Sequence, residues 1–232
     1  MECIVLAGGL GTRLRGAIGN YPKCMAAVNE KPFLHYVFDY LQQQGCMRVV
    51  LSLGYMHEVI TEWLDTQTRP FEVTYVIEQE PLGTGGGIQL AMHAAKTDNV
   101  AVLNGDTLFN IDLNEVMTFH QQHNAATTLA LKEMHAFDRY GVVRVDDARH
   151  ILSFEEKKYQ DTGLINGGIY IINKAAILQK QLPEKFSFEK DYLEAFVNEQ
   201  TFYGLPCDAY FIDIGIPEDY QKAQTDFKTL FA

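Results

Sequence analysis

Three glycines follow the first apolar run of the sequence and stand just before an arginine. Residues 4–7 lead into Gly8, Gly9 and Gly11, and Arg13 comes two residues later. Glycine is needed where a backbone turns with positive φ or approaches a ligand closely. A glycine loop after a strand also presents backbone N–H groups, which bind phosphate. The start of the chain therefore predicts a phosphate-binding loop.

Two common phosphate-binding signatures do not describe this loop. The dinucleotide fingerprint G-x-G-x-x-G would need a third glycine where Leu14 stands. The P-loop pattern G-x-x-x-x-G-K-[ST] does not occur in the chain. The missing glycine argues against an oxidoreductase that binds a dinucleotide, so the loop must serve another phosphate chemistry.

The segments that position this loop alternate between strand and helix as far as residue 125. Strand-like runs at 48–53, 72–78 and 100–106 are separated by helix-like segments at 32–45, 57–64 and 85–96. Such alternation predicts a parallel sheet with right-handed crossovers. Ligands bind outside the carboxyl ends of the strands in such sheets. The glycine loop, residues 78–87 and residues 104–106 all fall at such ends.

The pattern changes after residue 125, where apolar runs are joined by short turns. Strands are predicted at 127–133, 140–146, 150–156, 167–173 and 209–215, with helices at 174–182, 187–199 and from Pro217 onward. We therefore expect one α/β domain over 1–232, with a Rossmann-like mixed sheet. Its parallel core would comprise residues 1–125, and a β-rich section, residues 126–232, would lie beside that core.

Composition narrows the class of protein further. The chain has 232 residues, which suits one α/β domain, and a net charge of -11, which disfavours a nucleic-acid partner. The sequence has no apolar run long enough to cross a membrane and no secretory leader, so we expect a cytoplasmic protein. The four cysteines are scattered and are expected to be reduced. The sequence specifies no oligomeric state, and a homo-oligomer is compatible with it.

Seven short motifs together resemble those of the sugar-1-phosphate nucleotidyltransferases. They are LAGGLGTRL at 6–14, Pro22-Lys23, PLGTGGGI at 81–88, NGD at 104–106, FEEK at 154–157, NGGIY at 166–170 and DIGIPEDY at 213–220. They occur in the family's order over nearly the whole chain. The resemblance implies that a sugar 1-phosphate attacks the α-phosphorus of a nucleoside triphosphate and that pyrophosphate leaves, with Mg²⁺ as cofactor. Such chemistry needs alignment and charge neutralisation more than covalent help.

The same resemblance implies that residues 1–125 bind the nucleotide and that residues 126–232 bind the sugar phosphate. It also implies three sets of site residues. The nucleotide-binding set is Leu6, Gly8, Gly9, Gly11, Thr12, Glu78, Gly83 and Thr84. The catalytic set is Arg13, Lys23, Asp106 and Asp213, of which the two aspartates would also bind Mg²⁺. The sugar-phosphate set is Gly141, Glu156, Lys157 and Asn166. Mg²⁺ prefers one or two carboxylates together with substrate phosphates, which agrees with an aspartate pair.

Each assignment has a plainer alternative. Arg13 and Lys23 would then be solvated loop cations, and Asp106 a turn or cap residue. Glu156 and Lys157 would form surface ion pairs. His120 and His123 lie three residues apart like metal ligands, but no third ligand accompanies them, so we expect a solvated helix face. Asp112 and Glu115 are expected to cap that helix.

Glu78 bears on which base is used, because it stands where the family reads the base edge. A carboxylate accepts hydrogen bonds and donates none. Guanine presents N1–H and its exocyclic amine side by side, whereas uracil and thymine flank one N–H with carbonyls. Glu78 therefore favours GTP, unless it merely faces solvent. Cys24, beside Lys23, is a hypothetical thiol of lowered pKa.

Four longer segments resemble the members of the family that act on a heptose 1-phosphate with GTP. They are DRYGVVRVD, LINGGIYIIN, EKFSFEKDYL and YFIDIGIPEDY. The implied partners are GTP and that sugar 1-phosphate. Two alternatives remain open, namely a nucleotidyltransferase for mannose 1-phosphate or for another base, and a non-catalytic homologue that binds a nucleotide sugar and regulates a partner.

Overall fold

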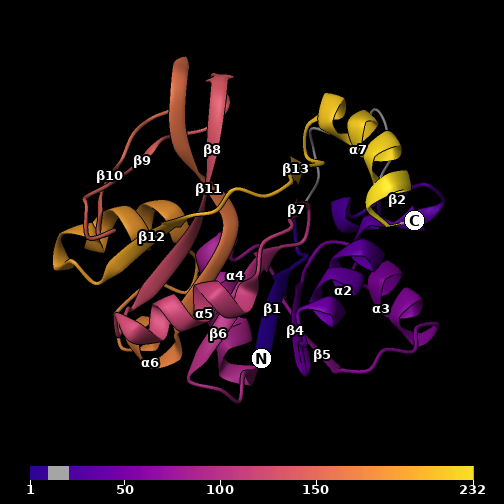
Figure 1. Cartoon of the computed structure of the whole chain (residues 1–232). Helices are drawn as coiled ribbons and strands as arrows, with labels where there is room; N and C mark the ends of the chain where they lie inside the picture. The colour runs from indigo at the N-terminus through magenta and orange to yellow at the C-terminus, as the bar shows by residue number, and fades with distance from the viewer. Residues whose placement is uncertain (10–20, 232) are drawn as a thin grey trace.

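A seven-stranded mixed sheet forms the centre of the molecule (Figure 1). The computed structural model describes residues 1–9 and 21–231. In spatial order the strands are β12 (Phe202–Pro206), β8 (Thr127–Phe137), β11 (Gln160–Asn173), β6 (Asn99–Asn104), β1 (Glu2–Leu6), β4 (Arg48–Leu53) and β5 (Glu72–Ile77). The predicted α/β class with a mixed sheet is confirmed.

The strands of the N-terminal half run parallel, as the alternating pattern predicts. β1 pairs with both β4 and β6, and β4 pairs with β5, all in parallel register. The connecting helices are α2 (Phe33–Gln43), α3 (His57–Asp65) and α4 (Gly83–Ala94). Leu6 and Asn104 are register partners at the carboxyl ends of β1 and β6. The chain therefore leaves the sheet at one edge, where ligands of such sheets bind.

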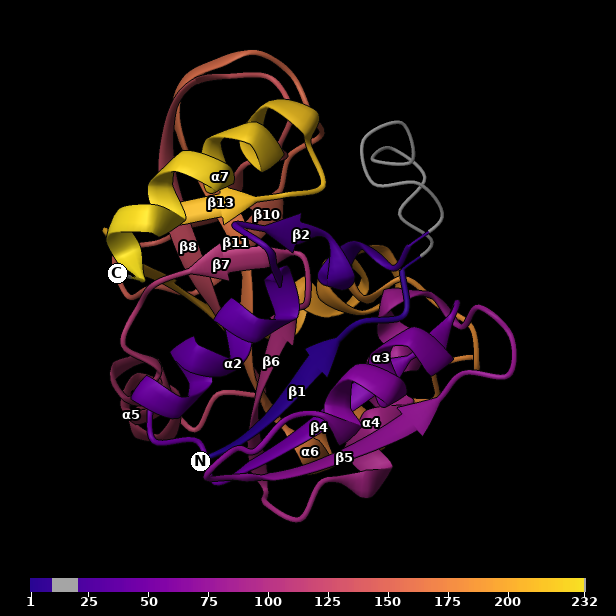
Figure 2. The same ribbon diagram turned by 90° about the vertical axis from the view of Figure 1, so that its right-hand side faces the viewer.

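Two helical layers cover the sheet, one on each face (Figure 2). Alternate residues of β1 point to opposite faces, so Cys3 and Val5 join one core and Ile4 the other. The first core includes α2, α3 and α5 (Leu113–Gln122), and the second includes α4, α6 (Lys174–Leu178) and the π-helix η3 (Phe188–Glu194). Both faces are thus buried, which is why the central strands are almost continuously apolar.

The C-terminal half extends this sheet instead of lying beside it. β11 pairs antiparallel with β6 and β8, and β12 pairs in parallel with β8. β9 (Val143–Val145) and β10 (Ile151–Phe154) form a separate antiparallel pair outside this sheet. β12 was not among the predicted strands, because its sequence FYGLP combines glycine with proline and has no clear alternation. This segment forms a strand because its backbone pairs with β8, and not because of its local sequence pattern.

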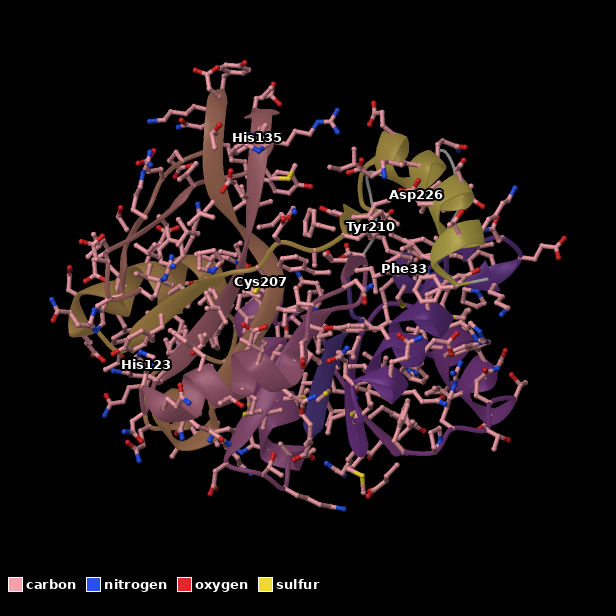
Figure 3. All side chains as sticks on the ribbon, in the orientation of Figure 1. Phe33, His123, His135, Cys207, Tyr210 and Asp226 are labelled. Atoms are coloured by element: carbon pink, nitrogen blue, oxygen red, sulfur yellow. The ribbon has the colours of Figure 1, made fainter. Side chains whose placement is uncertain are left out.

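Short elements close the structure around the edge of the sheet. β7 (Thr107–Phe109) pairs antiparallel with β13 (Phe211–Asp213), and β2 (Ala27–Val28) pairs with β3 (Lys31–Pro32). The remaining short helices are η2 (Lys23–Met25) and η4 (Val197–Glu199). The last helix, α7 (Pro217–Leu230), packs onto α2, with the Phe227 ring centroid 4.8 Å from that of Tyr36. Tyr210, before β13, donates a hydrogen bond of 2.6 Å to Asp226 of α7 (Figure 3).

The expected solvated histidine pair is only half right. His123 is exposed and stacks on Phe119 at the end of α5 (Figure 3), but His120 is only 1% exposed. The His120 ring bonds to Thr128 Oγ1 at 2.9 Å and Asn99 Oδ1 at 3.2 Å. It is therefore a satisfied core histidine. Asp112 caps the helix as expected, since its Oδ1 accepts hydrogen bonds from the backbone N–H groups of Asn114 at 2.8 Å and of Glu115 at 3.4 Å.

Two expectations about the environment of the protein meet structural observations. In the part of the chain that the structure describes, no helix is both long and apolar enough to cross a membrane. The expectation of a cytoplasmic protein stays a prediction. All four cysteines are free thiols, as expected.

Candidate active site

Two adjoining cavities open at the carboxyl ends of β1 and β6. The first has a volume of about 370 Å³ and the second of about 470 Å³. Lys23, Asn104 and Asp106 line both cavities. The sheet therefore presents one continuous cleft with two chambers, and a cation and a carboxylate lie at their junction.

The first chamber contains the described part of the predicted nucleotide set. Its lining includes Leu6, Gly8, Gly9, Glu78, Gly83 and Thr84. Gly11, Thr12 and Arg13 lie outside the described residues, so their positions stay predictions. Much of this wall is backbone and small side chains, which suits close approach of a flat base and of phosphates. The prediction that these segments share one edge of the sheet is confirmed.

Glu78 is held in place and does not simply face solvent. The residue is half-buried, and its Oε2 accepts a hydrogen bond of 3.0 Å from the backbone N–H of Leu82. Its Oε1 accepts a weaker one of 3.4 Å from the Ser52 hydroxyl. A Cβ at Gly8 or Gly87 would lie within 2.8 or 2.9 Å of Oε1, so both glycines make room for the carboxylate. The acceptor expected for a guanine edge is thus fixed in the chamber.

Three charged groups gather at the junction of the chambers. Lys23 Nζ lies 2.8 Å from Asp106 Oδ2. Asp213 is the register partner of Thr107, the residue after Asp106, because β13 pairs with β7. A Cβ at Gly215 would lie 2.8 Å from both Asp213 Oδ1 and Lys23 Nζ, and 3.6 Å from Asp106 Oδ2. The short β7–β13 ladder is therefore what brings two carboxylates from distant parts of the sequence to one lysine.

This donor set suits a hard divalent cation that substrate phosphates also ligate. Within residues 1–9 and 21–231, no group of three or more histidine, cysteine, aspartate or glutamate side chains is arranged to hold a metal by itself. Asp106 and Asp213 provide two carboxylates, and Mg²⁺ commonly takes one or two carboxylates and completes its shell with phosphates and water. The pair therefore fits a metal that arrives with a nucleotide.

The second chamber contains all four residues of the predicted sugar-phosphate set. Gly141, Glu156, Lys157 and Asn166 line it together with Asp213. Asn166 is oriented on both sides, since its Nδ2 donates to the Tyr170 hydroxyl at 2.8 Å and its Oδ1 accepts from Gly168 N at 3.0 Å. An amide held in this way is suited to recognise hydroxyl groups with little loss of entropy on binding.

The expected surface ion pairs occur one residue away from the predicted site residues. Glu155 pairs with Arg144 at 2.6 Å and with Lys158 at 3.3 Å. Among the described residues, neither Glu156 nor Lys157 forms an ion pair within 4.0 Å. Both side chains are exposed at the chamber, so their charges remain available to a ligand.

Several lining residues were not predicted. Asn104, Tyr140 and Tyr170 belong to quoted motifs but received no role, and Glu189 and Lys190 come from the segment that forms η3. The segment SFEKDYL was predicted to be part of a helix and contributed to the family resemblance, but its acidic and basic residues were given no individual roles. A π-helix is uncommon and often marks a functional site, but no sequence rule announces one.

The hypothesis of a reactive Cys24 is wrong. The thiol is 2% exposed, and burial, assisted by the nearby charge of Asp106, raises the pKa of Cys24 to about 12. Cys24 packs under the first chamber while its neighbour Lys23 points to Asp106. Its reactivity as a thiolate is therefore suppressed at neutral pH.

A family comparison agrees with this geometry. The family model described as "Nucleotidyl transferase" matches residues 2–229. The chain belongs to this nucleotidyl transferase family. The matched residues include every residue that lines the two chambers.

Two curated relatives carry the same name. D-glycero-alpha-D-manno-heptose 1-phosphate guanylyltransferase of Aneurinibacillus thermoaerophilus is 50% identical over 98% of this chain and 99% of the relative. The protein of that name from Campylobacter jejuni is 46% identical over 95% of this chain and 97% of the relative. Mannose-1-phosphate guanyltransferase of Schizosaccharomyces pombe is 31% identical, and the alignment spans 62% of that protein.

Two solved structures share this fold. HddC from Yersinia pseudotuberculosis complexed with GMP-PN is 38% identical, with a TM-score of 0.87 over 97% of this chain and 99% of that chain. UDP-glucose pyrophosphorylase complexed with UDP-glucose has a TM-score of 0.80 at 18% identity, which shows the fold alone.

Proposed function

We propose that this nucleotidyl transferase transfers GMP from GTP to D-glycero-α-D-manno-heptose 1-phosphate, giving GDP-heptose and pyrophosphate. The observation that carries the proposal is the full-length identity of 50% to a guanylyltransferase named for that sugar phosphate. The position of Glu78 in the first chamber agrees with the base, because its carboxylate is an acceptor for the guanine edge.

The two chambers suggest how the substrates are divided. GTP would occupy the first chamber, against the backbone of Gly8 and Gly9, with its base toward Glu78. The sugar phosphate would occupy the second, with Glu156 accepting hydrogen bonds from sugar hydroxyls and Lys157 binding the phosphate. Residues 1–125 would thus bind the nucleotide and residues 126–232 the sugar phosphate. Asp213 is the exception, because it reaches the junction from the second region.

Alignment at the junction is the main catalytic task. A phosphate oxygen of the sugar attacks the α-phosphorus, a P–O bond forms, and the bond to the departing pyrophosphate breaks. Lys23 lines both chambers and is placed to draw the two anionic substrates together. Arg13, in the glycine loop, is assigned to the charge of the leaving pyrophosphate, because a guanidinium offers planar, fixed donors.

Asp106 and Asp213 would hold Mg²⁺, which when bound offsets the charge of the phosphates and orients them. In the structure Asp106 pairs with Lys23, so the lysine and a metal would share this carboxylate. The relatives are consistent with a divalent ion, and its identity as Mg²⁺ is part of the proposal.

Product analysis tests the proposal. The purified chain is incubated with GTP, heptose 1-phosphate and Mg²⁺, and the nucleotide products are separated by anion-exchange chromatography. We expect GDP-heptose and pyrophosphate in equal amounts, and no product after removal of divalent ions with EDTA. Formation of a product from mannose 1-phosphate, but none from the heptose phosphate, would assign the chain to the other guanylyltransferase class.

A further inference from the structure

Two short segments interlock beside the chambers. Residues 82–86 include Gly83 and Thr84 of the first chamber, and residues 184–189 include Ser187 and Glu189 of the second, so we call this pair of segments the wall. Gly85 N donates to Phe186 O, and Phe186 N donates to Leu82 O, both at 3.0 Å. A Cβ at Gly83 would lie 2.6 Å from Phe186 O, and one at Gly85 would lie 2.1 Å from the Phe186 ring. Only glycines at these positions let the second segment come so close.

Side chains continue this contact from one chamber to the other. The Thr84 hydroxyl donates to Glu189 Oε2 at 3.0 Å and accepts from the backbone N–H of Phe188 at 3.0 Å. The same Glu189 oxygen accepts a second hydrogen bond, of 3.2 Å, from Ser187 Oγ. Thr84 lines the nucleotide chamber, whereas Ser187 and Glu189 line the sugar chamber. One hydroxyl is therefore bonded across the wall.

The nucleotide side of the wall is also tied to the base acceptor. Leu82 N donates to Glu78 Oε2, and Leu82 O accepts from Phe186 N. A ligand that binds Glu78 and the backbone of Gly83 and Thr84 would thus restrain residues 82–84. Glu189 accepts its hydrogen bond from Thr84 of this segment. Hydrogen bonds to a carboxylate are the stronger ones, so losing the Thr84 bond leaves Glu189 with a weaker restraint.

We propose that Thr84 is a positioning residue that couples the two substrates. Nucleotide binding fixes residues 82–84, Thr84 then fixes Glu189, and the sugar phosphate binds more tightly to the ordered chamber. The inference rests on the proposed function, since it takes GTP and a sugar 1-phosphate as the ligands. In thermodynamic terms each ligand would raise the affinity for the other by the same factor.

Isothermal titration with the wild-type chain and two Thr84 variants tests the coupling. Heptose 1-phosphate is titrated into the protein with Mg²⁺, alone and with a GTP analogue whose methylene bridge between the α- and β-phosphorus prevents transfer. We expect the analogue to tighten binding of the sugar phosphate to the wild-type chain roughly tenfold, the value of one charged hydrogen bond. Thr84→Val should reduce that factor to nearly 1, and Thr84→Ser should restore it.

Two controls separate coupling from loss of structure. Thr118→Val removes a hydroxyl that bonds to Asn114 O on α5, and it should keep the wild-type factor. In a double variant with Glu189→Ala, Thr84→Val should add no further loss of coupling, because both changes break the same link.

The outcomes are distinct. If the GTP analogue tightened sugar-phosphate binding to Thr84→Val as much as to the wild-type chain, the inference would be overturned. It would also be overturned if Thr84→Val lost affinity equally for the analogue and for the sugar phosphate and had lower thermal stability, because a purely structural role produces that result. If the wild-type chain bound neither ligand, the proposed function would fail, and the inference with it.

Discussion

The two chambers of the cleft are built from different materials. The first is walled largely by glycines, alanine and backbone from the ends of parallel strands. The second is lined by ionisable and aromatic side chains from a hairpin, from β11, from η3 and from β13. The difference follows from the sheet, because the parallel half ends in tight loops at one edge, and the antiparallel half sends long strands past that edge (Figure 1).

This contrast suggests a division of recognition. Backbone groups and glycines approach phosphates and a flat base closely but discriminate little between bases, so we expect base choice to depend on one side chain, Glu78. Side chains in the second chamber can differ from one family member to the next without disturbing the sheet. Sugar choice is therefore expected to depend on several residues together, each with a moderate effect.

A change at the junction should affect both chambers and have the largest effect. Asp106→Asn removes a negative charge that pairs with Lys23 at 2.8 Å and that would bind the metal. We expect kcat to fall by roughly a thousandfold in a pyrophosphate-release assay, because charge neutralisation at the phosphates is lost. The Mg²⁺ concentration for half-maximal rate should rise as well.

Asp112→Asn is the matched control for this junction variant. Asp112 caps α5 and lines neither chamber, and asparagine also caps helices well. Its kcat should equal that of the wild-type chain. A loss of less than tenfold in Asp106→Asn would remove this aspartate from the catalytic set.

A change confined to the first chamber should alter base choice and leave the sugar side intact. Glu78→Gln keeps the shape of the side chain but replaces one acceptor by a donor, which opposes the guanine amine. We expect kcat/KM for GTP to fall about a hundredfold, on the scale of an unpaired buried polar group, and KM for the sugar phosphate to stay within twofold.

The same assay with UTP and dTTP sharpens this prediction. Glutamine can pair with a uracil edge, so the ratio of GTP to UTP rates should drop. The exposed neighbour Glu80→Gln serves as control and should keep the GTP preference. An unaltered base preference in Glu78→Gln would assign base reading to another residue.

A change confined to the second chamber should have a smaller effect. Glu156→Gln removes the negative charge of the side chain and keeps its length. Glu156 forms no ion pair within the described residues. We expect KM for the sugar phosphate to rise about tenfold, because one charged hydrogen bond is lost, and KM for GTP to change little. Glu133→Gln, on an exposed part of β8, is the control and should change neither constant.

A change outside both chambers should affect stability and not catalysis. Burial lowers the pKa of His120 to about 4, so the folded chain keeps this imidazole neutral below the usual pKa of about 6.5. As the pH falls from about 6.5 towards 4, the unfolded chain binds the proton first, and stability is lost. His120 should account for about 2 kcal/mol of lost stability between pH 7 and pH 5.

Chemical denaturation of His120→Gln at pH 7 and pH 5 measures this contribution. The difference between the two pH values should shrink by that amount relative to the wild-type chain, and kcat at pH 7 should stay the same. An equal pH dependence in both proteins would show that His120 gains its proton without unfolding.

The ends of the predicted strands indicated where the first chamber lies, whereas the residues of the second chamber came from the family resemblance alone. Gly8, Gly9 and Glu78 stand directly at the ends of strands whose apolar runs are easy to recognise, and parallel pairing places such ends together. Local pattern and tertiary structure agree there, so motif and topology lead to the same prediction.

The second chamber depends on contacts that local pattern does not reveal. Asp213 reaches Asp106 through the three-residue ladder of β7 and β13, and β7 was not predicted at all. Glu189 bonds to Thr84 from the start of a π-helix, where the sequence indicates an ordinary helix. The burial of His120 likewise comes from long-range packing against Thr128 and Asn99.

The most direct test of the account is a pyrophosphate-release assay with Mg²⁺ that crosses five nucleotides with three sugar phosphates. GTP, UTP, dTTP, CTP and ATP would each be paired with heptose 1-phosphate, mannose 1-phosphate and glucose 1-phosphate. The account predicts a strong signal with GTP and the heptose phosphate, and weak or no signal elsewhere. A strong signal with UTP or dTTP would contradict the role given to Glu78, and no signal with any pair from the folded protein would contradict the proposed activity.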